Sequence, residues 1–160
     1  MKNFTQTNTF KVLKVTVITF FITILVVGVF TMGTGIDFKD MEEVSNTATE
    51  FMQLSSEGKI QEAYAMTSRD FQQTNSFEFL QEFNDSNPWL FKDFQNIQTE
   101  KFNVVSKLGI EGKFYTIAGK TFYTNGDVGV FEFELIEESK LPKILSFELY
   151  VDENRYSAYK

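Results

Sequence analysis

Three side chains have the chemistry for acid–base catalysis: the phenols of Tyr115 and Tyr123 and the carboxylate of Asp70. A carboxylate that faces a tyrosine in an apolar interior could act as a base, with the phenol as a hydrogen-bond donor. The alternative is structural, because tyrosines are common at half-buried strand positions and a loop carboxylate is usually solvated. The chain has no histidine, so the commonest general base and metal ligand are both missing. We therefore expect a protein that is not an enzyme and that holds no cofactor and no metal.

A second candidate is the run of aromatic residues between positions 71 and 94, which is denser than one helical face can bury. Some of these side chains could line a pocket or an interface for a lipid tail, a peptide or a partner's apolar patch. The alternative is that they form the core of a protein that contains 19 Phe. The candidate ligand-binding residues, two tyrosines included, are Phe71, Phe83, Trp89, Phe94, Tyr115 and Tyr123.

The formal net charge is −7, and the chain contains no cysteine. An acidic surface repels phosphate backbones, so nucleic acid is not an expected partner. Without cysteine, the domain cannot depend on disulfides and the protein cannot be a lipoprotein.

Glu132, Glu134, Glu137 and Glu138 could indicate a cation site, but strand alternation places the first two on a polar face, where solvent is the usual neighbour.

The element that positions everything else is the uncharged run from Val15 to Met32. As an α-helix it would rise about 27 Å, close to the thickness of the hydrocarbon core of a bilayer. It predicts a transmembrane helix over 15–32, preceded by a short tail over 1–14 and followed by a glycine-containing linker over 33–40.

A cleaved signal peptide is the alternative, because Lys2, Lys11 and Lys14 precede the apolar run. A retained anchor is favoured, since the run is longer than a usual signal-peptide core and no A-x-A-like cleavage site follows it. Basic residues before the span and acidic residues after it favour a cytoplasmic N-terminus. The domain is then expected on the periplasmic or extracellular side of the cell membrane.

The expected domain covers 41–154 and begins with helices. Apolar residues three or four positions apart predict a first helix from Met41 that stops near Gly58. Asn75, with Glu78 three residues later, has the spacing of a helix cap. The other expected segments are a second helix over 60–66, a loop over 68–74, a third helix from its cap to Phe83, a break over 84–88 and one turn over 89–94.

From about Ile97 the apolar period changes to two, which predicts strands. Asn125-Gly126 predicts a tight hairpin turn, because these residues tolerate positive φ. The tail over 155–160 is expected to fray. Helices followed by a four-stranded meander predict an α+β domain with the helices on one face of the sheet. The four expected strands are Phe102 to Leu108, Lys113 to Tyr123, Val128 to Glu137 and Lys143 to Val151.

This order of elements, with the segments EGKIQEAYAMTSRDFQ, GKTFYTNGDVGVFEFELIEES and LPKILSFELYV, resembles the NTF2-like (cystatin-like cone) superfamily. The resemblance covers Met41 to Tyr150 and is closest to small membrane-anchored bacterial members of unknown function. One departure is Pro142-Lys143-Ile144, where many members have Trp-Lys-Ile. The resemblance implies about three helices packed on a curved four-stranded antiparallel sheet. It also implies a pocket that members use as an active site, for ligands or for oligomer contacts.

We expect a single-pass membrane protein that presents a non-enzymatic interaction or assembly domain outside the cytoplasm. Its partners would be other proteins or further copies of itself. In this it resembles the inner-membrane scaffolds of secretion and conjugation machines. The alternative is that the cone pocket binds a small apolar ligand or a lipid.

Overall fold

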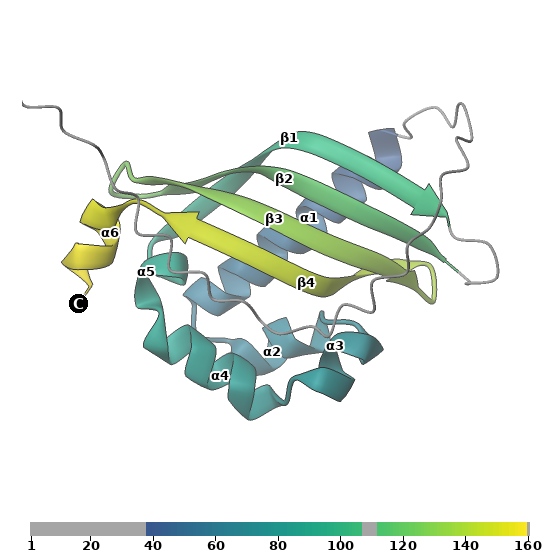
Figure 1. Ribbon diagram of the computed structural model, residues 1–160, viewed down its shortest axis with the longest axis horizontal. Coiled ribbons are helices and arrows are strands. Elements are labelled where there is room, and N and C mark those ends of the chain that lie inside the picture. The colour runs from purple at the N-terminus through teal and green to yellow at the C-terminus, as the bar shows by residue number, and fades with distance from the viewer. Residues whose placement is uncertain (1–37, 107–111, 160) are drawn as a thin grey trace, which may run out of the picture.

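The first helix, α1 (Phe38–Ser56), crosses the inner face of the sheet, as Figure 1 shows. Its buried residues recur every three or four positions, which confirms the predicted apolar face. The helix ends at Ser56, and Gly58, with a φ of +73°, lets its own amide and that of Lys59 bond back to the last turn. The buried residues of this helix are Val44, Ala48, Phe51, Met52 and Ser55.

This computed structural model describes residues 38–106 and 112–159. The predicted membrane span over 15–32, with the tail before it, lies outside these ranges. Within the described ranges, no helix is long and apolar enough to cross a membrane.

Four short helices follow α1, and they differ from the prediction in detail. The segment predicted as a loop over 68–74 is largely α3 (Arg69–Thr74), because the Ser68 hydroxyl caps it by accepting from the Phe71 amide at 3.1 Å. The cap of α4 (Phe77–Ser86) is Ser76 and not Asn75, and this helix continues past the predicted break at Asn84. The remaining two short helices are α2 (Ile60–Ala65) and α5 (Pro88–Phe91).

The sheet is a four-stranded antiparallel meander in the order β1-β2-β3-β4, as predicted. The predicted start of β1 at Phe102 is wrong, since the strand begins at Phe94. Apolar and polar residues alternate poorly in the first half of β1, which also has two register shifts relative to β2. Its pairing with β2 therefore defines this strand better than its own sequence does. The strands are β1 (Phe94–Ser106), β2 (Lys113–Tyr123), β3 (Val128–Glu138) and β4 (Leu141–Val151).

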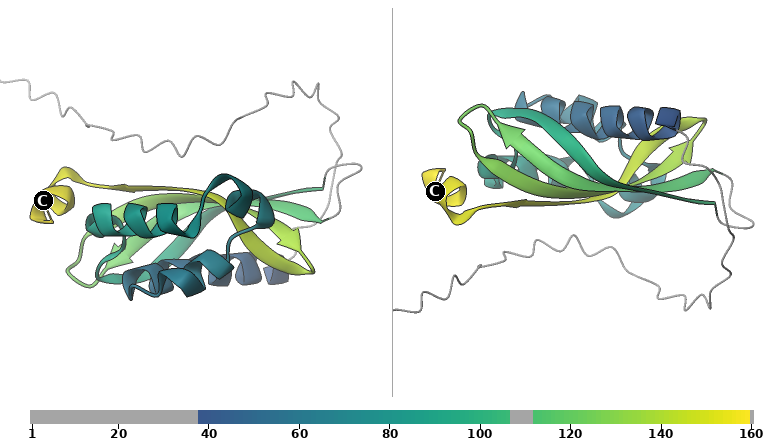
Figure 2. Two further views of the ribbon diagram at one scale, coloured as in Figure 1. Left: turned by 90° about the horizontal axis from the view of Figure 1, so that it is seen from below. Right: turned by 90° about the horizontal axis from the view of Figure 1, so that it is seen from above.

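Helices α1 to α5 lie on the inner face of the twisted sheet, which Figure 2 shows from two further sides. Helix α1 contacts β1, β2 and β4, while α3 and α5 contact β4. Inward side chains alternate with outward ones along β3, from Gly129 to Leu135, so the predicted two-faced strand is confirmed.

The C-terminal residues differ from the expected frayed tail over 155–160. They form a helix, α6 (Glu153–Ala158), whose first turn is capped by the Asp152 carboxylate, which accepts from the Arg155 amide at 2.8 Å. Arg155 itself is only 1% exposed. A buried arginine needs partners from elsewhere in the fold, which sequence spacing does not reveal.

The turn between β2 and β3 and the turn between β3 and β4 are built differently. In the predicted Asn125-Gly126 turn, only Gly126 has a positive φ, of +88°. In the turn between β3 and β4, Ser139 and Lys140 both have positive φ, 53° and 67°. Such turns favour Asn-Gly, because a Cβ disfavours this backbone region.

We expect the double change Ser139→Asn with Lys140→Gly to raise the free energy of unfolding by about 1 kcal/mol. Urea denaturation, followed by the fluorescence of the single tryptophan, Trp89, measures the change. The comparison variant is Gly126→Ala, whose new Cβ would meet nothing within 4 Å. It should lower the stability by a similar amount through backbone strain alone. Equal stability of all three proteins would contradict this account of the turns.

Candidate functional site

Tyr115 lies on the inner face of β2, where it is buried and stacks on Phe102. Its hydroxyl donates to the Glu137 carboxylate at 3.2 Å. Burial raises the pKa of Tyr115, and the negative charges of Asp40 and Glu137 raise it further. The phenol therefore stays protonated at neutral pH and acts as a hydrogen-bond donor to Glu137.

Tyr123 lies at the far end of the same strand and is also buried. Its hydroxyl donates to the carbonyl of Leu90 at 2.9 Å, and the Arg155 guanidinium lies over its ring, 3.5 Å from the centroid. Burial raises the pKa of Tyr123, and the nearby Arg155 charge opposes that rise. This tyrosine joins the sheet to α5 and α6.

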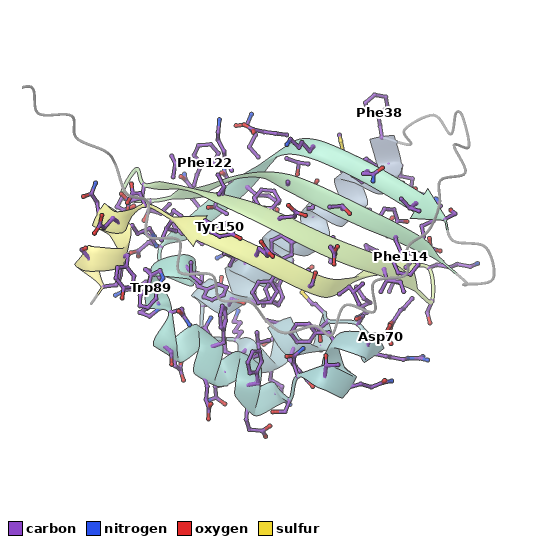
Figure 3. All side chains as sticks on the ribbon, in the orientation of Figure 1. Phe38, Asp70, Trp89, Phe114, Phe122 and Tyr150 are labelled. Atoms are coloured by element: carbon purple, nitrogen blue, oxygen red, sulfur yellow. The ribbon has the colours of Figure 1, made fainter. Side chains whose placement is uncertain are left out.

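Asp70 is exposed in the first turn of α3, on the helical side of the molecule (Figure 3). Both tyrosine hydroxyls already have other partners, Glu137 for Tyr115 and the Leu90 carbonyl for Tyr123. The structure therefore does not bring the three side chains together as a base and its hydrogen-bond donors.

The candidate aromatics are distributed over different parts of the interior. Phe71 and Phe83 both contact the ring of Phe147, with centroids 6.4 and 5.8 Å away. Trp89 packs instead edge-on against Tyr156 of α6, at 4.7 Å, and Phe94 is buried at the start of β1. These six candidates therefore do not share one site.

Phe147 of β4 is the residue that the sequence reasoning missed. Besides Phe71 and Phe83, its ring contacts Phe51 of α1 at 5.1 Å and Phe133 of β3 at 5.9 Å. It thereby joins three helices to the sheet. A single phenylalanine on a strand gives no sign of such a role, because its partners come from four separate segments.

The glutamates of β3 that were considered as a cation site have different neighbours. Glu137 points inward to Tyr115, while Glu138 accepts from the backbone amide of Arg69 at 3.0 Å. Glu134 accepts from the Ser146 hydroxyl at 2.7 Å. Among the described residues, no group of three or more acidic side chains is arranged to hold a metal ion.

The outer face of the sheet carries a second group of apolar side chains. Val128 pairs with Phe122 and Val130 pairs with Tyr150, so the four lie together at one end of this face. Figure 3 shows Phe122 and Tyr150 on the neighbouring strands. Val128 and Val130 are 42% and 48% exposed. We call these four residues the outer patch.

The outer patch borders charged residues of both signs. Lys120 of β2 pairs with Val130, and Glu148 of β4 accepts a hydrogen bond from the Tyr150 hydroxyl. This bond, together with burial, raises the pKa of Tyr150 to about 12. The sequence did indicate two valines on the polar side of β3, but it could not show that Phe122 and Tyr150 lie beside them.

No protein-family model and no curated protein matches this chain. Among solved structures, it is similar to Aln2 from a Streptomyces species, with 11% sequence identity and a TM-score of 0.47. That likeness covers 80% of this chain and 99% of Aln2. The described residues form an α+β domain, with helices packed on one face of a four-stranded antiparallel sheet.

Proposed function

We propose that this chain is a single-pass membrane protein with an NTF2-like domain that acts as an assembly module outside the cytoplasm. The uncharged run over 15–32 and the charges on either side of it support the anchor and its orientation. The long helix, the short helices and the meander follow the element order that the NTF2-like resemblance implies.

The observation that carries the proposal is the contrast between the two faces of the sheet. On the inner face, the tyrosine hydroxyls are bonded to other groups of the domain and the phenylalanine rings contact one another. On the outer face, the valines of the outer patch are exposed side by side. Exposed apolar patches of this kind typically mark interaction surfaces.

A second copy of this chain is the partner that suits the outer patch best. Lys120 on one side of the patch already pairs with Glu100 at 2.9 Å, and Glu148 on the other side accepts from the Tyr150 hydroxyl, so the border is engaged within the domain and the centre of the patch is apolar. A strongly charged partner of either sign would compete with these internal contacts, whereas another apolar surface would not. A two-fold pair places the apolar centre of one copy against that of the other.

We expect the full chain in mild detergent to sediment as a dimer, and the double variant Val128→Lys with Val130→Lys to sediment as a monomer. Four lysines at the centre of a two-fold interface repel one another and lose the apolar contact. The matched control adds the same charge on exposed helical positions, as Gln61→Lys with Gln81→Lys, and should remain dimeric. A wild-type chain that is monomeric at every concentration, with no protein co-purifying from its membrane, contradicts the proposal.

The alternative, a small apolar ligand or a lipid bound inside the cone, gains no support from the interior. The space between α1 and the sheet is where Phe51, Phe133 and Phe147 contact one another. Mass spectrometry of small molecules retained by the full chain in mild detergent tests this alternative in the preparation used for sedimentation.

A further inference from the structure

Three exposed apolar side chains lie at the end of the domain where the described chain begins. Phe38 opens α1 and is 77% exposed, and Figure 3 shows its ring projecting away from the sheet. Leu141, at the start of β4, is 56% exposed, and Val105, at the end of β1, is 43% exposed. We call these three residues the proximal surface.

The strand register places these residues at one end of the sheet. Val105 pairs with Phe114 near the start of β2, and Phe114 pairs with Ile136 near the end of β3. Leu141 follows directly on the turn that ends β3. Figure 1 shows the start of α1 at the same end.

A salt bridge attaches the start of α1 to this end of the sheet. Lys113, the first residue of β2, bonds to Asp40 in the first turn of α1 at 2.6 Å. Phe38 lies two residues before Asp40, so its position is fixed relative to the sheet and not only to the preceding chain.

Two acidic groups at this end, Asp40 and Glu138, have basic partners within the domain. Asp40 is paired with Lys113, and Glu138 accepts from the Arg69 amide and lies 3.9 Å from its guanidinium. Lys140, at the tip of the turn beside Leu141, adds an exposed positive charge. These two pairs and Lys140 offset part of the acidic charge at this end, where Glu42 is also exposed, and so weaken its repulsion from an anionic surface.

The length of chain before Phe38 limits how far this end can be from a membrane. The predicted span ends at Met32, so residues 33–37 alone connect it to Phe38. Five extended residues reach at most about 18 Å, and the headgroup layer of one leaflet occupies about 5–8 Å of that distance. Thus the proximal surface is the part of the domain held nearest to the lipid.

We propose that the proximal surface contacts the bilayer that holds the anchor, with Phe38, Val105 and Leu141 inserted among the phospholipid headgroups. Apolar and aromatic side chains are stabilised in that interfacial layer, where a nearby lysine can reach the lipid phosphates. The contact would fix the direction in which the outer patch is presented. This inference rests on the membrane anchor of the proposed function.

The test uses the full chain in phospholipid vesicles with one spin label at a time. Because the chain contains no cysteine, a label at Ser106→Cys, beside Val105, is unique. The control is Thr124→Cys, in the turn at the opposite end of the sheet. We expect the Ser106 label to be relaxed by oxygen, which concentrates in the bilayer, and the Thr124 label by a water-soluble nickel chelate.

The double variant Phe38→Ser with Leu141→Ser removes apolar groups that are exposed, so the fold should be retained. We expect it to shift the Ser106 label toward nickel accessibility while the chain remains in the membrane after alkaline washing. If the Ser106 and Thr124 labels on the otherwise wild-type chain are equally accessible to nickel while the chain still resists washing, the surface contact is overturned and the anchor is retained. Release of the wild-type chain by washing overturns the anchor, and the contact with it.

Discussion

Replacing Arg155 with alanine should lower the free energy of unfolding by about 3–5 kcal/mol, because the change breaks a buried network at several points. The guanidinium donates to the carbonyls of Trp89 and Lys92 and pairs with Asp127 at 3.1 Å. It also lies over the ring of Tyr123. Alanine leaves both carbonyls without these donors, and removes the link between α6, α5 and the hairpin that joins β2 to β3.

Urea denaturation measures the loss, and the fluorescence of Trp89 reports the same region, since its ring packs on α6. Arg155→Lys should recover only a small part of the stability, because an ammonium cannot reproduce the fork that serves three acceptors and stacks on Tyr123. Asn154→Ala, at the exposed neighbouring position, should change the stability by less than about 0.5 kcal/mol. A loss below about 1 kcal/mol for Arg155→Ala would show that α6 is not held by this network.

Local sequence patterns correctly predicted those helices and strands that are defined by their own residues and not by distant contacts. The buried face of α1, the stop at Gly58 and the bounds of β2 all follow from periodicity or from a residue with one special conformation. The first half of β1 was missed because its pairing with β2, rather than its own alternation, makes it a strand. Helix α3 was missed because a serine cap and one buried phenylalanine, Phe71, stabilise a segment with little periodicity.

The candidate site was less predictable than the fold. The aromatic density between positions 71 and 94 did indicate an apolar interior, and Phe71, Phe91 and Phe94 are buried. Residue type alone could not say that the tyrosine hydroxyls would be bonded to Glu137 and to a backbone carbonyl. Nor could it say that Arg155, near the end of the chain, would be buried against Tyr123, since those contacts join residues far apart in sequence.

The second large effect is expected at Phe147, the ring that connects the helices to the sheet. Phe147→Ala should lower the free energy of unfolding by about 3–5 kcal/mol, because the removed ring leaves a cavity and its ring partners lose their contacts. Chemical denaturation measures the loss. The control is Phe79→Ala, since Phe79 is exposed on α4 and stacks on Phe83. This control should lose less than about 1 kcal/mol.

The same pair of variants also separates the two functions considered for the interior. If Phe51, Phe133 and Phe147 fill the cone by their mutual contacts, the wild-type chain has no space there for a ligand, whereas Phe147→Ala creates an apolar space that a small aromatic molecule can enter. Saturating benzene should therefore raise the melting temperature of Phe147→Ala and leave the wild type and Phe79→Ala unchanged. A wild-type domain that is itself stabilised by benzene, and that loses less than about 1 kcal/mol with Phe147→Ala, would favour a ligand pocket over an assembly module.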